Sequence, residues 1–178
     1  MKVEYGVRSK PVETEVVALW WSRFALDYND SIHKNLEHLK TRLKADNETS
    51  GSGVYAFIGA HDAVPTPHLL YIGVAHKQPL RDEICASMFP TIGYKAGTEL
   101  YFFEDTWDVT IQWAPIPDGS LARLVETLLI VSHSPQFNAQ KVRRADIPDQ
   151  ASHLLVLNGG RKGRLQPAVA GHTFSYWI

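Results

Sequence analysis

Five features in the middle of the chain carry side chains that could do chemistry. They are Gly53-Val54-Tyr55, Tyr71-Ile72-Gly73, Arg81, Glu126 and Asn138. A phenol can exchange a proton, a guanidinium can hold an anion, a carboxylate can bind a cation, and an amide can bridge polar groups. Taken singly, each feature also has an ordinary explanation: strand ends, a solvated arginine, a helix-surface glutamate and a turn asparagine. Their significance therefore depends on their order and spacing.

Order and spacing give the five features a common interpretation. Arg81 follows Tyr71 by ten residues, and Glu126 precedes Asn138 by twelve, in an apolar helix that leads into Ser-Pro-Gln-Phe-Asn. In this arrangement residues 51–140 resemble the GIY-YIG nuclease superfamily. The fold of that family is α+β, with a core of a three-stranded antiparallel sheet flanked by helices.

The resemblance implies an endonuclease that hydrolyses phosphodiester bonds with one divalent cation, Mg²⁺ or Mn²⁺. Glu126 would be the metal ligand, since a carboxylate oxygen suits a hard cation, and Arg81 would hold the scissile phosphate with its planar fork of donors. Tyr55 and Tyr71 would line the site, and one of them, which the sequence leaves open, would activate water. Asn138 would tie the segment after the helix to the strands of the site.

The compact chain adds an expectation about the substrate. Because its extensions are short, it looks more like the restriction enzymes of the family than the homing or repair enzymes, which implies double-stranded DNA as the partner and allows a homodimer. This step is an analogy at the level of the fold.

Two positions depart from the family pattern. Many members have a histidine or tyrosine four residues after the arginine, where this chain has Cys85, and several have a lysine after the second tripeptide, where this chain has Val74. Two alternatives therefore stay open: a nucleic-acid-binding or regulatory module that has lost efficient catalysis, and a structural domain in which the motifs only maintain the sheet.

The pattern of apolar residues predicts the elements that would position these groups. The four-residue spacing of Val16, Trp20 and Phe24 predicts a helix, and an apolar stripe from Ile32 to Leu43 predicts a second one. Strands are expected at 54–58, 69–74 and 107–113, with helices at 79–89 and 121–133. The chain is thus expected to be one domain, 1–178, with an N-terminal helical extension (1–50), a nuclease-like core (51–140) and a C-terminal basic extension (141–178).

Composition narrows the setting and the mode of binding. The 178 residues carry a formal net charge of -1, so no global positive field attracts nucleic acid or acidic membranes. The extension 141–178 is locally basic, however, and six of its residues are candidates for nucleic-acid binding: Lys141, Arg143, Arg144, Arg161, Lys162 and Arg164. One cysteine, no long apolar run and no apolar leader predict a cytoplasmic protein without a membrane partner.

Overall fold

The computed structural model describes residues 14–27, 29–61, 64–87, 106–138 and 147–171. Along the chain, the elements are β1 (Glu15–Ala25), α1 (Ile32–Ala45), the short 3-10 helix η1 (Asn47–Ser50), β2 (Gly53–His61), β3 (Val64–Ala75), α2 (Leu80–Ser87), β4 (Thr106–Pro115), α4 (Gly119–His133), α5 (Asp149–Ser152), β5 (Leu154–Gly160) and β6 (Ala168–Ala170). The expected α+β class is confirmed. No helix in the described ranges is long and apolar enough to cross a bilayer.

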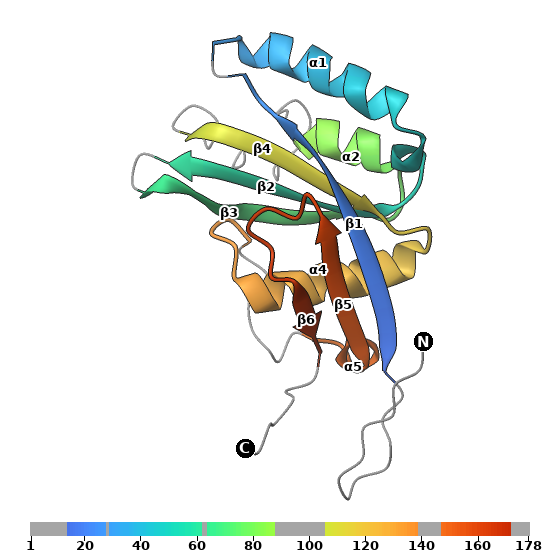
Figure 1. Cartoon of the computed structure of the whole chain (residues 1–178). Helices are drawn as coiled ribbons and strands as arrows, with labels where there is room; N and C mark the ends of the chain where they lie inside the picture. The colour runs from blue at the N-terminus through green and yellow to red at the C-terminus, as the bar shows by residue number, and fades with distance from the viewer. Residues whose placement is uncertain (1–13, 28, 62–63, 88–105, 139–146, 172–178) are drawn as a thin grey trace, which may run out of the picture.

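One mixed six-stranded sheet, in the order β3-β2-β4-β1-β5-β6, organises the molecule (Figure 1). β2 pairs antiparallel with β3 and β4, β1 pairs antiparallel with β4 and parallel with β5, and β5 pairs antiparallel with β6. The three strands expected in the core are therefore neighbours in a larger sheet. The segments outside 51–140 contribute the other three strands.

The first N-terminal helix expected from the sequence is wrong, because Glu15–Ala25 is strand β1. A spacing of four residues fits a helix, but it also fits a strand, in which every second side chain shares a face. The buried residues of this strand are Leu19 and Trp21, whereas Trp20 is 75% exposed. The second helix is confirmed as α1, which buries Leu36, Leu39 and Leu43.

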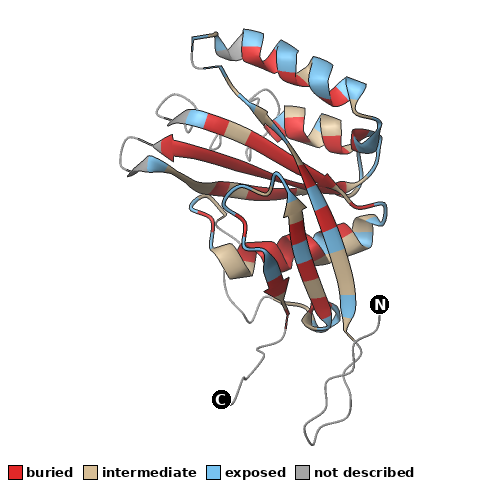
Figure 2. Ribbon diagram, viewed as in Figure 1, coloured by how far each residue is buried: buried red, intermediate tan, exposed pale blue. Residues whose placement is uncertain are grey.

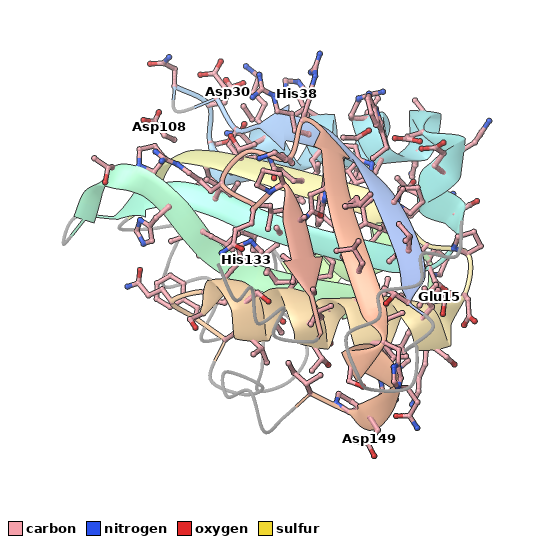
Figure 3. All side chains as sticks on the ribbon, turned by 60° about the horizontal axis from the view of Figure 1, so that its bottom comes forward. Glu15, Asp30, His38, Asp108, His133 and Asp149 are labelled. Atoms are coloured by element: carbon pink, nitrogen blue, oxygen red, sulfur yellow. The ribbon has the colours of Figure 1, made fainter. Side chains whose placement is uncertain are left out.

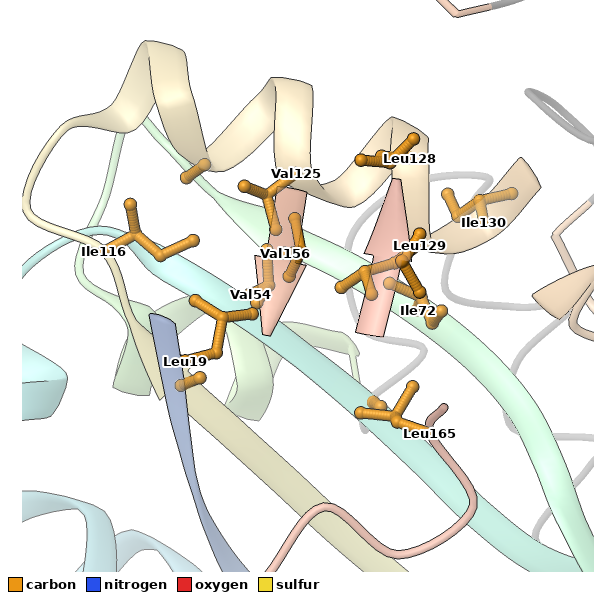
Figure 4. Packing of buried hydrophobic residues seen from close by; sticks show 14 of the residues in the cluster. Leu19, Val54, Ile72, Ile116, Val125, Leu128, Leu129, Ile130, Val156 and Leu165 are labelled. Carbon is orange, nitrogen blue, oxygen red and sulfur yellow. The ribbon is translucent and has the colours of Figure 1, made fainter. Parts of the chain in front are cut away.

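The sheet is covered by different helices on its two faces, and α4 lies opposite α1 and α2 (Figure 1 and Figure 3). β2 shows this clearly: Val54 and Ala56 belong to the core with α4, whereas Tyr55 and Phe57 belong to the core with α1 and α2. β5 and β6 also pack into the α4 core, through Val156 and other residues (Figure 4). Alternation along a strand therefore decides on which side each candidate residue lies.

β4 is buried on both faces, although its polar residues alternate with apolar ones. Its polar residue Gln112 is only 1% exposed. Its Nε2 donates to the carbonyl of Arg161, 2.7 Å away, in the segment between β5 and β6. The C-terminal segment thus covers the polar face of β4.

Candidate functional site

The two tripeptides interlock across the β2–β3 pair. Tyr55 is the register partner of Gly73, and Phe57 is the partner of Tyr71. The rings of Tyr55 and Tyr71 lie 6.1 Å apart between centroids, and Phe57 stacks on Tyr71 at 5.9 Å. A Cβ atom at Gly73 would lie 2.3 Å from Cζ of Tyr55, so the Tyr55 ring occupies the space that a larger residue would need. These contacts bring the motif residues of both strands together on one face.

The two tyrosines differ in their access to solvent. Tyr55 is 1% exposed, and its hydroxyl lies 2.6 Å from the hydroxyl of Ser87 at the end of α2. Tyr71 is half-buried. Of the two phenols, Tyr71 is therefore the better placed to meet a substrate, and Tyr55 is placed to support it. Ser87 carried no signal in the sequence, because only the fold brings it to Tyr55.

Arg81 lies in the first turn of α2, next to Leu80, which is buried against the same face as the tyrosines. Its side chain is 40% exposed, and its Nε lies 3.8 Å from Oδ1 of the exposed Asp82. An exposed pair at this distance binds weakly. The guanidinium can therefore exchange this neighbour for an anionic ligand.

Cys85, one turn after Arg81, is half-buried. Burial raises the pKa of its thiol above the usual value. A thiol with a raised pKa stays protonated at neutral pH and is a poor nucleophile or base. Cys85 therefore does not supply the titrating group that many family members have at this position. Val74, the second departure, packs partly buried against the core with α4.

Asn138 makes the contact that the resemblance implied. Its Oδ1 accepts from the backbone N–H of Ile72 at 2.9 Å, and its Nδ2 donates to the carbonyl of Ile72 at 2.8 Å. The backbone N–H of Phe137 also donates to the carbonyl of Leu70. The segment after α4 is thus held against the outer edge of β3, beside Tyr71.

Glu126 is placed differently from the other candidates. It is 7% exposed on α4, the helix that packs on the face opposite Tyr55 and Tyr71. Within the described ranges, no three His, Cys, Asp or Glu side chains form a metal-binding group. A single carboxylate nevertheless suits Mg²⁺, which keeps several waters and takes phosphate oxygens from its substrate. The carboxylate of Glu126 fits this requirement by its chemistry, whereas its place on α4 separates it from Tyr55, Tyr71 and Arg81.

The basic candidates fall into two groups. Lys141, Arg143 and Arg144 lie outside the described residues. Arg161 and Arg164 are exposed, and Nζ of Lys162 donates to the carbonyl of Leu165 at 2.8 Å. Strand β5 leads directly into the segment that carries Arg161, Lys162 and Arg164.

The segment between β5 and β6 is fixed to α4 by His133. Nε2 of His133 accepts from the backbone N–H of Gln166 at 2.9 Å, and its Nδ1 lies 2.8 Å from the carbonyl of Leu129. Since a backbone N–H can only donate, Nε2 carries no proton and Nδ1 is the donor. Burial lowers the pKa of His133, in agreement with a neutral ring.

Comparison of the chain with protein-family models, curated proteins and solved structures finds no match in any of the three. The resemblance to GIY-YIG nucleases therefore rests on the motif residues and their order.

Proposed function

We propose that the chain is a divalent-metal-dependent endonuclease that hydrolyses phosphodiester bonds in double-stranded DNA, as a restriction-type member of the GIY-YIG superfamily. The observation that carries this proposal is the bridge from Asn138 to both polar groups of the Ile72 backbone. That bridge fixes the middle of Tyr71-Ile72-Gly73 from a residue 66 positions away. It is the contact that the resemblance implies.

In this proposal the role of each described residue follows from the exposure of its side chain to solvent. Tyr71 orders or deprotonates the attacking water, and Arg81 neutralises the phosphate oxygens with its planar donors. Tyr55 and Ser87 position Tyr71 through the packed rings and the buried hydroxyl pair. Asn138 acts as a positioning residue, because its amide is committed to the β3 backbone.

Glu126 is the residue that would hold Mg²⁺ or Mn²⁺. The resemblance implies that this cation would stabilise charge on the phosphate and on the departing oxygen, which requires Glu126 to act from the face of the sheet opposite Tyr71 and Arg81. A phenol with its ordinary pKa of about 10 is mostly protonated at neutral pH, so Tyr71 also needs a positive neighbour to act as a base. Arg81 is the candidate cation on the tyrosine face.

A second function, a nucleic-acid-binding or regulatory module with weakened catalysis, is favoured by one specific observation. Burial raises the pKa of the Cys85 thiol, so the thiol stays protonated at neutral pH. The position one helical turn after Arg81 therefore has no group that could exchange a proton during catalysis. Binding would then use the exposed Arg161 and Arg164 without turnover. Such binding would weaken steeply with salt.

Incubation with supercoiled plasmid, linear DNA and single strands, with Mg²⁺, Mn²⁺ or chelator, separates these functions. The endonuclease proposal predicts metal-dependent cutting that falls about 100-fold or more in Tyr71→Phe, the size typical of a lost acid or base. Arg81→Lys should also lose most of the activity, because an ammonium cannot reproduce the fork. The matched control, Arg42→Lys, alters an exposed arginine of α1 and should cut normally.

Two results would contradict the endonuclease proposal. Cutting that survives in both Tyr71→Phe and Arg81→Lys would mean that other residues carry it. Salt-dependent binding of many DNAs, with no cutting in any metal, would favour the binding module instead.

A further inference from the structure

A short segment between β5 and β6, residues 161–167, packs on the side of the sheet that α4 covers, and we name it the strap (Figure 1). Most of the strap is exposed, as Figure 2 shows, but Leu165 is buried in the core with α4. Gly163 has a φ of +55°, in the left-handed region that favours glycine. A Cβ atom at Gly163 would lie 2.6 Å from Nε2 of Gln112 and 2.8 Å from Cδ1 of Ile58. The strap therefore lies directly on β2 and β4.

One end of the strap is held by groups that do not change charge. The backbone N–H of Arg161 donates to the carbonyl of Trp21 at 2.9 Å. The carbonyl of Arg161 accepts from Nε2 of Gln112 at 2.7 Å. These partners are a peptide group and a side-chain amide, which keep the same donors and acceptors when the pH changes near neutrality. We therefore expect the Arg161 end of the strap to stay in place as the pH falls.

The other end of the strap is held by a titratable group. The backbone N–H of Gln166 donates to Nε2 of His133, 2.9 Å away at the end of α4. The carbonyls of Gln166 and Pro167 accept from Asn158, each at 2.8 Å. Histidine is the side chain whose charge ordinarily changes between about pH 5 and 8. His133 is therefore the pH-dependent partner in this set of contacts.

Protonation of His133 would remove its hydrogen bond to Gln166 directly. Nδ1 lies 2.8 Å from the carbonyl of Leu129 and donates to it, so an added proton goes to Nε2. The new Nε2–H group and the backbone N–H of Gln166 would then be two donors that face each other. Turning the ring over does not help, because both nitrogens of an imidazolium donate. A charged His133 and a closed strap are therefore incompatible at this contact.

The surroundings of His133 also oppose its protonation. Burial lowers the pKa of His133, the hydrogen bond with Leu129 raises it by less, and the ammonium of Lys162 on the strap lowers it further. β2, β3 and β6 present apolar side chains to α4. The carboxylates on α4 and α5 are Glu126, about two turns before His133, and Asp149, which Figure 3 shows well apart from it. The other charged side chains of α4 and the strap are exposed: Arg123, Arg161 and Arg164.

We propose that His133 is a pH-sensitive latch for the strap. The neutral ring holds the Gln166 end against α4, and the protonated ring releases it, while the Arg161 end stays bound. The part that opens lies between the two sets of contacts that do not titrate, and it includes Leu165 and the exposed Arg164. The change is a local opening of one segment rather than unfolding of the sheet. The latch does not depend on the proposed endonuclease activity.

Nuclear magnetic resonance of the ¹⁵N-labelled full chain, titrated from about pH 8 to about pH 4.5, tests the latch over a range that extends below the ordinary pKa of histidine. At the upper pH we expect a His133 ring protonated only at Nδ1, and an N–N coupling across the hydrogen bond from Gln166 to Nε2. As the ring gains its second proton, that coupling should vanish. Hydrogen exchange at Gln166, corrected for the intrinsic effect of pH, should then become about tenfold faster, the effect of one lost hydrogen bond. Exchange at Arg161 should change less than about twofold, because its partner does not titrate.

Variants of the titrating group and of its neighbour sharpen the test. His133→Gln keeps an acceptor without a titrating ring, so the Gln166 amide should stay protected at every pH. The matched control His38→Gln removes an exposed imidazole of α1 and should leave the transition unchanged. Lys162→Gln removes the positive neighbour of His133, so the strap should open at a higher pH. Far-UV circular dichroism should show every variant to be folded.

Several results would overturn the latch. The first is a His133 ring that carries its single proton on Nε2 at neutral pH, or that stays neutral down to the lowest pH at which the chain is folded. The second is an unchanged exchange rate at Gln166 while the ring titrates, or a transition that persists in His133→Gln. The third is a loss of protection at Arg161 together with Gln166, which would mean general unfolding rather than release of one end of the strap.

Discussion

Gly73→Ala should destabilise the protein by crowding Tyr55. The new Cβ would lie 2.3 Å from Cζ and 2.4 Å from the hydroxyl oxygen of Tyr55, against about 3.5–4.0 Å for a relaxed contact. The ring cannot simply move aside, since it is 1% exposed and its hydroxyl pairs with Ser87. Gly73 is not among the described glycines with positive φ, so an alanine backbone itself fits. The cost therefore comes from packing.

The size of the effect follows from two contributions. Overpacking a core typically costs about 1–3 kcal/mol, and a disturbed buried hydrogen bond adds about 1–2 kcal/mol. The lower entropy of the unfolded alanine chain returns about 0.4–1 kcal/mol, which leaves a net loss of about 2–4 kcal/mol. For a chain of this size, each kcal/mol lowers Tm by about 2–4 °C. Urea unfolding, followed by circular dichroism, measures the loss directly.

A double-mutant cycle tests the cause of this loss. In a Tyr55→Ala background, Gly73→Ala should cost less than about 0.5 kcal/mol, because the ring that it would strike is gone. Gly51→Ala is the matched control, since no atom lies within 4 Å of the new Cβ, and it should be neutral or slightly stabilising. An equal cost of Gly73→Ala in both backgrounds would refute the packing explanation.

Three further predictions concern polar contacts. Asn138→Ala should lower the free energy of unfolding by about 1–2 kcal/mol, because it removes two partly solvated hydrogen bonds. As a control, Gln136→Ala at an exposed position should cost less than about 0.5 kcal/mol. Equal effects of the two substitutions in urea unfolding would contradict the anchoring role of Asn138. His133 has a lowered pKa, so its contribution to stability is complete above its unfolded value of about 6.5 and is lost as the pH falls through the lower folded value. Urea unfolding between pH 8 and pH 4.5 should therefore show an acid-side loss that is smaller in His133→Gln; identical pH profiles would refute this. Tyr55→Phe should lower the free energy of unfolding by about 1–2 kcal/mol, because the hydroxyl of Ser87 loses its hydrogen-bond partner. Adding Ser87→Ala should recover part of that loss. A further full loss in the double variant would argue against the hydrogen bond between Tyr55 and Ser87.

The sequence predicted several elements well because their signals are local. The stripe from Ile32 to Leu43 acts through neighbouring residues, and both α1 and α4 form close to where helices were expected. The two hydrogen bonds between Asn138 and the backbone of Ile72, 66 positions earlier, agree with the tie to the strands that the resemblance implied. These successes share a source, namely patterns that are visible without knowledge of the sheet order.

The misses arise from tertiary contacts. Val16, Trp20 and Phe24 fit both a helix and a strand, and pairing with β4 and β5 decides for the strand. Gln112 has a polar side chain on an alternating strand, yet the segment after β5 covers it. Such choices depend on which segments meet in space, and a local pattern does not contain that information.

The candidate site, like the fold, was predicted only where the signal is local in the sequence. The motif identified Tyr55 and Tyr71 together but did not distinguish them, because the difference lies in the burial of Tyr55 beneath α2 and its contact with Ser87. Glu126 was grouped with the tyrosines by order in the sequence, whereas α4 packs on the opposite face of the sheet. The metal-binding role of Glu126 is therefore the step of the proposal that most needs a direct test.

The most direct measurement is the cleavage of supercoiled plasmid by the wild-type protein and by Glu126→Gln, each with Mn²⁺, with Mg²⁺ and with chelator. Glu48→Gln, at an exposed position of η1, serves as the matched control, and thermal unfolding verifies that Glu126→Gln is folded. We expect metal-dependent cutting by the wild type and by Glu48→Gln, and a loss of at least about 100-fold in Glu126→Gln, as for removal of a residue essential to transition-state stabilisation. Undiminished cutting by a folded Glu126→Gln would contradict the proposed metal site.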